Sequence, residues 1–197
     1  MTKNRLLNIA ITICKLAKLI YIFSFILITF VFIHFQIDRE YYNEFNPKIN
    51  TQTTNTPSSF SLNFKTLNKW GSNNSKNNNE VFTFDKISTS SVYILFFKYG
   101  AILILLFLCT KEFQKIIESI KNLNTFKERN ASSFKSIGKY LIFYYLLTSY
   151  SITYFKESEI SEINLTFGPL IIILITFIMA EIFKEGNTLM EENDLTV

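Results

Sequence analysis

Long apolar blocks alternate along the chain with stretches that contain few apolar residues. A helix rises about 1.5 Å per residue, so about 20 apolar residues cross the roughly 30 Å of hydrocarbon in a bilayer. Blocks of this kind lie at residues 16–35, 91–110, 138–155 and 165–183. The pattern therefore predicts an all-α membrane protein of one domain, built as a four-helix transmembrane bundle.

The third block is the shortest, and hydroxyl groups interrupt it. On a helix, five of these side chains would form one stripe: Tyr140, Tyr144, Thr148, Ser151 and Tyr154. Packing against the other helices is the simpler interpretation of this stripe, because hydroxyls facing lipid would lose hydrogen bonds. A polar pathway through the bundle is the alternative.

The segment between the first two spans, residues 36–90, is long and rich in Asn, Ser and Thr. Two runs within it, "FSLNFKTL" and "EVFTFDKI", alternate apolar and polar residues, as strands with one covered face do. We expect a small extracytoplasmic β-hairpin insertion, with Trp70 near its tip as a candidate outer contact. Its covered face would consist of Phe60, Leu62, Phe64, Phe82 and Phe84. A structural lid and a ligand-sensing element are both consistent with such a hairpin.

The distribution of basic residues, within a net charge of +4, indicates how the chain crosses the membrane. The amino-terminal stretch up to Lys18 has four bases and no acid, and residues 111–139 have seven bases against three acids. Residues 156–164 have one base and three acids. Cytoplasmic loops carry the excess of Lys and Arg, so we expect both termini in the cytoplasm. Residues 36–90 would then form the extracytoplasmic loop, residues 111–137 a cytoplasmic helical segment and residues 184–197 a cytoplasmic tail.

Two stretches on the predicted cytoplasmic side, "NTFKERNASSFKSIGKYL" and "AEIFKEGNTLMEENDLTV", resemble a family of small bacterial integral membrane proteins, domain of unknown function 2975. The matching residues at the carboxyl end are Phe183, Gly186, Leu189, Glu192, Asp194, Leu195, Thr196 and Val197. The resemblance implies four spans, a long first outer loop and location in the bacterial cytoplasmic (inner) membrane. It also implies a partner, a small cytoplasmic helix-turn-helix regulator, and it implies no activity.

Acidic residues follow the last span directly, where the anionic inner leaflet would repel them. The basic segment 111–137 is predicted on the same side of the membrane. We therefore predict that the tail folds back on this segment as a clamp. Gly186 would permit a close helix approach, and Leu189 would pack on the Ile116–Ile120 face. The candidate clamp residues are Phe183, Gly186, Leu189, Glu192, Asp194 and Arg129.

Lys98 and Glu181 are candidate charges within or at the boundary of the spans, where ionisable groups are functional candidates by default. Lys98 can also extend outward to the interface, and Glu181 can pair with a base of the inner segment. The chain has one histidine, no nucleophile beside a base at motif spacing and no glycine-rich phosphate loop. We therefore expect no enzyme, and predict no catalytic, cofactor-binding or metal-binding residue.

These observations favour a sensory or regulatory membrane protein that couples the extracytoplasmic loop to a cytoplasmic partner. The alternative is a small transporter or an immunity-type protein that acts within the bilayer. Transporters usually show repeats and broken helices, of which this sequence offers little. The basic residues are scattered among acids and flank the apolar blocks, so direct nucleic-acid binding is not expected. Homo-oligomer formation stays open.

Overall fold

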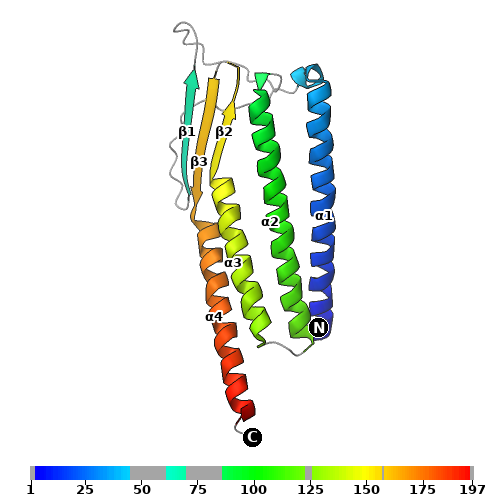
Figure 1. The fold of residues 1–197 in the computed structure, drawn as a ribbon, viewed down its shortest axis with the longest axis vertical. Helices are drawn as coiled ribbons and strands as arrows, with labels where there is room; N and C mark the ends of the chain where they lie inside the picture. The colour runs from blue at the N-terminus through cyan, green and yellow to red at the C-terminus, as the bar shows by residue number, and fades with distance from the viewer. Residues whose placement is uncertain (1–2, 45–60, 70–85, 123–125, 157, 196–197) are drawn as a thin grey trace. The chain divides into compact units, whose positions relative to one another are not determined.

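The computed structural model describes residues 3–44, 61–69, 86–122, 126–156 and 158–195 (Figure 1). Its elements in chain order are α1 (Lys3–Ile37), the short 3-10 helix η1 (Glu40–Glu44), β1 (Ser61–Lys69), α2 (Thr89–Lys121), α3 (Glu128–Ser149), β2 (Tyr150–Tyr154), β3 (Ser158–Thr166) and α4 (Phe167–Leu195). The chain divides into two compact units. Unit 1 comprises Met1–Ser24, Ile102–Leu146 and Gly168–Val197, and unit 2 comprises Phe25–Ala101 and Leu147–Phe167.

Three of the described helices, α1, α2 and α4, are long and apolar enough to cross a membrane. Their apolar side chains are largely uncovered by the rest of the chain: Leu19 and Phe30 of α1 are 64% and 66% exposed, and Leu174 of α4 is 60% exposed. Lipid tails can cover such surfaces, whereas water would disfavour them. The chain is therefore a membrane protein that is mostly helical, as the pattern of apolar blocks predicts.

The predicted third span, residues 138–155, is helical only in its first part. Helix α3 ends at Ser149, and the residues that follow form strand β2. The sequence of β2, "YSITY", is rich in aromatic and β-branched residues, which favour strands once a partner strand is available. The predicted hydroxyl stripe is therefore wrong beyond Thr148, because Ser151 and Tyr154 lie in a strand.

Unit 2 contains an antiparallel sheet with the strand order β1-β3-β2 (Figure 1). Strand β1 pairs with β3 along its whole length, from Ser61 opposite Thr166 to Lys69 opposite Ser158. The expected hairpin is corrected accordingly, since β1 pairs with a strand from the segment between α3 and α4. The expected partner run with Phe82 and Phe84, like Phe60, lies outside the described residues.

The predicted covered face of the first strand is also wrong. Leu62 and Phe64 are 37% and 46% exposed, whereas Leu67, on the opposite face of β1, packs on the core of unit 2. This core consists of Ile87, Phe155 and Ile160, with Leu67 and Val92 packed against it. Period-two alternation identifies a strand but does not say which face is covered, because the partner lies far away in the sequence.

Candidate functional site in the contacts of helix α2

Helix α2 begins with a serine cap that also binds the sheet of unit 2. The backbone N–H of Ser91 donates to Ser88 Oγ at 3.2 Å, which caps the helix that starts at Thr89. Ser91 is fully buried, and its Oγ accepts a hydrogen bond from the backbone N–H of Tyr154 at 2.6 Å. The backbone N–H of Ser88 donates to the carbonyl oxygen of Tyr154 at 2.9 Å. The start of α2 is thus bonded to the end of β2.

Lys98 makes a second contact between α2 and the same strand. Its Nζ donates to the carbonyl oxygen of Tyr150, the first residue of β2, at 2.7 Å. The ammonium group therefore satisfies the backbone at the junction where α3 ends and β2 begins. We call Ser88, Ser91, Lys98, Tyr150 and Tyr154 the α2–sheet contact.

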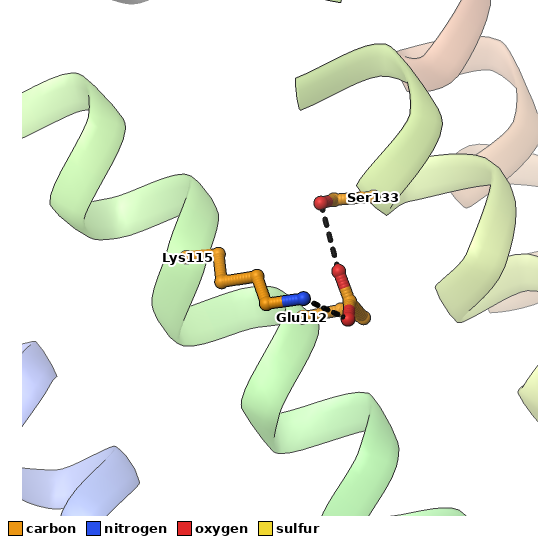
Figure 2. Close-up of polar contacts among 3 residues, drawn as sticks. All are labelled: Glu112, Lys115 and Ser133. Atoms are coloured by element: carbon orange, nitrogen blue, oxygen red, sulfur yellow. Dashed lines mark hydrogen bonds and ion pairs between the residues drawn. The ribbon is translucent and has the colours of Figure 1, made fainter. Parts of the chain in front are cut away.

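In unit 1, the far end of α2 is bonded to the start of α3. Figure 2 shows Lys115 and Ser133 approaching the two carboxylate oxygens of Glu112 from different sides. Lys115 Nζ lies 2.5 Å from Glu112 Oε1, and Ser133 Oγ donates to Glu112 Oε2 at 2.9 Å. Ser133 is 4% exposed and the Glu112 side chain 16% exposed, so the carboxylate is held largely out of solvent.

One helical turn earlier in α3, a second hydrogen bond joins the same two helices. Asn130 is 1% exposed, and its Nδ2 donates to Ser119 Oγ at 2.9 Å. Asn130 and Ser133 are three residues apart, and Glu112 and Ser119 are seven apart, so each pair lies on one helix face. We call Glu112, Lys115, Ser119, Asn130 and Ser133 the α2–α3 contact.

Aromatic rings pack α3 against α4 in unit 1. The Phe183 ring is buried, with ring centroids 5.6 Å from Phe126 and 5.0 Å from Phe134. Gly186 lies directly against the Phe126 ring, so that a Cβ at this position would overlap it. A Cβ at Gly138 would lie 2.8 Å from Phe177 Cζ. Gly138 thus allows close approach of α3 and α4, and Gly186 allows Phe126, which lies just before α3, to pack on α4.

The structure brings Phe183 and Gly186 of the predicted clamp together against the Phe126 ring. Leu189 is 64% exposed, so the predicted packing on the Ile116–Ile120 face is wrong. The tail continues α4 as helix to Leu195, with Glu192 exposed and Asp194 in the last turn. No residue of the helix turns back on 111–137, because "EGNTLMEENDL" has no proline and propagates the helix.

The remaining predicted residues lie apart from these contacts. Arg129 is exposed in the first turn of α3. Glu181 pairs with Lys184 of its own helix at 3.3 Å, both about two-thirds exposed, and not with a base of the inner segment. Trp70 lies outside the described residues. Among the residues that the structure describes, no group of three His, Cys, Asp or Glu side chains could hold a metal ion.

Sequence reasoning missed the serines, asparagine and glutamate that join α2 to its neighbours. One signal was available, since polar residues at one-turn or two-turn spacing on a helix lie on one face, where they can form hydrogen bonds to a neighbouring helix. Ser119 with Glu112, and Ser133 with Asn130, have this spacing. The partner of each pair could not be identified without the fold.

A family model described as "Protein of unknown function (DUF2975)" matches residues 75–197. The chain belongs to this family. The matched range includes α2, α3, β2, β3 and α4, and therefore every residue of the α2–sheet and α2–α3 contacts. Helix α1 and strand β1 lie outside the matched range. No curated protein and no solved structure matches the chain.

Proposed function

We propose that the DUF2975 chain is a regulatory membrane protein that transmits a change in the extracytoplasmic sheet to the cytoplasmic ends of α2 and α3. The main support for this proposal is that α2 is one continuous helix. It is hydrogen-bonded to β2 at its start and to α3 near its end. At about 1.5 Å per residue its 33 residues extend about 50 Å, which exceeds the roughly 30 Å of a bilayer's hydrocarbon. A displacement of its first turn therefore moves residues beyond the other membrane surface.

The chain connectivity supports the same coupling. Helix α3 runs into β2 without an intervening loop, and β3 runs into α4 in the same way (Figure 1). A shift of the β2–β3 pair along its register therefore pulls on α3 and α4 directly. Coupling between distant sites requires an element with two arrangements that both sites influence. Helix α2 and the α3–β2 segment are the candidates for this element.

The α2–α3 contact has a strength suited to a switch. A neutral hydrogen bond contributes about 0.5–1.5 kcal/mol net, and one to a charged group about 1.5–3 kcal/mol. The Asn130–Ser119 bond joins two neutral groups, and the Ser133–Glu112 bond joins a hydroxyl to a charged carboxylate. Together they stabilise the contact between α2 and α3 by a few kcal/mol, an amount that a ligand or partner of ordinary affinity can overcome.

The proposed topology has four spans in the bacterial cytoplasmic membrane, with both termini in the cytoplasm. Helix α3, with 22 residues and a length of about 33 Å, is the proposed third crossing. The base count of residues 111–139 supports this side assignment. With Cys14 and Cys109 replaced, a membrane-impermeant thiol reagent on intact cells should label Asn68→Cys in β1 and spare Thr188→Cys in α4. Labelling of Thr188→Cys alone would reverse the topology.

The proposed partner is a cytoplasmic protein with an acidic surface. Bases are exposed at the end of α2 and along α3: Lys111, Lys121, Lys127, Arg129, Lys135 and Lys139. Such a surface attracts an acidic partner and raises its association rate. The small helix-turn-helix regulator implied by the family resemblance is the partner that we propose. No nucleic acid contact by this chain is needed in this scheme.

The proposal is tested by comparing transcripts in a host strain that lacks the gene and carries plasmid copies of defined variants. Ser91→Ala disrupts the α2–sheet contact and Ser133→Ala the α2–α3 contact, and we expect both to change the same set of transcripts. Ser90→Ala and Ser132→Ala are matched controls, since both serines are exposed neighbours. If deletion of the gene changes no transcript, and the purified protein moves a solute across proteoliposomes, the regulatory function is wrong.

A further inference from the structure

Unit 2 contains an apolar cavity of about 370 Å³ between the end of α1 and the start of α2. Its lining includes Ile28, Phe32 and Phe35 of α1, and Val92, Phe96 and Tyr99 of α2. The first and last residues of each set are seven positions apart, which corresponds to about 10 Å along a helix. The volume lies within the range of about 300–1,000 Å³ that is typical of ligand sites. The cavity is therefore an apolar space that extends along two helices able to span a membrane.

Polar groups gather at one end of this cavity. Tyr42 of η1 lines it, and its hydroxyl lies 3.0 Å from His34 Nδ1. Arg39 Nη2 donates to Thr89 Oγ1 in the first turn of α2 at 3.2 Å, and the guanidinium lies over the Phe35 ring at 5.1 Å from its centroid. The cavity is thus apolar along its length and has a cation at its mouth.

Among the residues that the structure describes, Arg39 has no carboxylate within ion-pair distance. The neighbouring acid Asp38 accepts a hydrogen bond from the backbone N–H of Tyr41 through Oδ1. The guanidinium has five N–H donors, of which Thr89 takes one. A cation over an aromatic ring and beside a hydroxyl retains donors for an anion, and a guanidinium matches the geometry of a phosphate.

We infer that this cavity binds part of one acyl chain of an anionic phospholipid, whose phosphate is bound by Arg39. Three features of the site favour a lipid over other ligands. The lining is apolar throughout its length, the cation lies at one end only, and the two helices that form it belong in a bilayer. Tyrosines at the mouth, Tyr41 and Tyr42, are of the residue type that concentrates at the level of lipid headgroups. The inference is independent of the proposed regulatory function.

The test uses the full chain purified in detergent and incubated with phosphatidylglycerol and with diacylglycerol, which has identical acyl chains and no phosphate. Native mass spectrometry then counts the lipids of each kind that remain bound. We expect a retained phosphatidylglycerol on the wild type. Arg39→Gln should weaken its retention about tenfold or more while leaving that of diacylglycerol unchanged, because the variant lacks the charge-assisted bonds to phosphate. Arg39→Lys should recover part of the preference.

Two matched controls separate this site from general attraction of lipid. Lys86→Gln removes an exposed charge just before the start of α2 and should leave retention unchanged. Val31→Phe places a ring in the cavity lining and should lower retention of both lipids, whereas Ile33→Phe, at an exposed residue of α1 outside the lining, should not. Equal loss in the Arg39 and Lys86 variants, or wild-type retention by Arg39→Gln, would overturn the phosphate site. Wild-type retention by Val31→Phe would overturn the acyl-chain site.

Discussion

The hydrogen bond from Ser133 to Glu112 predicts a large effect of a very small substitution. Ser133→Ala removes one hydroxyl that is 4% exposed and that donates at 2.9 Å to a carboxylate which is itself largely buried. Hydrogen bonds to charged groups contribute about 1.5–3 kcal/mol, and Lys115 remains to compensate part of the loss at Glu112. We therefore expect the contact between α2 and the first turns of α3 to weaken by about 1.5–2 kcal/mol.

Hydrogen exchange of the protein in nanodiscs measures this weakening at the amides of residues 128–134. A loss of 1.5–2 kcal/mol corresponds to an increase in exchange of about ten- to thirtyfold, since about 1.4 kcal/mol equals a factor of ten. Ser132→Ala is the matched control, because Ser132 is exposed and the substitution changes helix propensity equally. If the two variants exchange at the same rate, Ser133 does not hold α3 to α2 and the reasoning fails.

Three further substitutions test other parts of the structure. Gly186→Ala places a methyl group against the Phe126 ring and should destabilise the protein by about 1–3 kcal/mol in thermal unfolding, whereas Gly168→Ala, with nothing within 4 Å of its Cβ, should not. Leu67→Asp places a charge against the core of unit 2 and should lower thermal stability more than Phe64→Asp, which lies on the exposed face of β1. The opposite order would contradict the assignment of the covered face of β1. Deleting residues 189–197 should leave trypsin cleavage between α2 and α3 unchanged, since Leu189 covers nothing there, and faster cleavage would revive the clamp.

The helices that can cross a membrane were predictable because their signal is local. A run of 20 or so apolar residues is sufficient to identify such a helix. Residues 111–137 were expected to be helical, and their first part is helical as the end of α2, where Ile116 and Ile117 are buried. The sequence also singled out Gly186 as a place of close approach, although its neighbour is Phe126 and not the end of α2.

The sheet and the tail show what local patterns do not determine. Strand β1 pairs with residues almost a hundred positions later in the chain, and a pairing of that kind depends on how the helices bring the strands together. The boundary at Ser149 was missed because an apolar run rich in Tyr and Leu can fit a helix or a strand. Charge complementarity suggested the clamp, but exposed ion pairs contribute too little to bend a helix that propagates well.

The central claim is that the α2–sheet contact and the α2–α3 contact are coupled through α2. Energetic coupling is reciprocal, so hydrogen exchange can measure it from both ends. Ser91→Ala, which affects the hydrogen bond to Tyr154, should raise exchange of residues 128–134 about fivefold or more, and Ser133→Ala should raise exchange of β2 by a comparable factor. Ser90→Ala, at an exposed serine, should do neither. Increases confined to the mutated end in both variants would contradict the coupling.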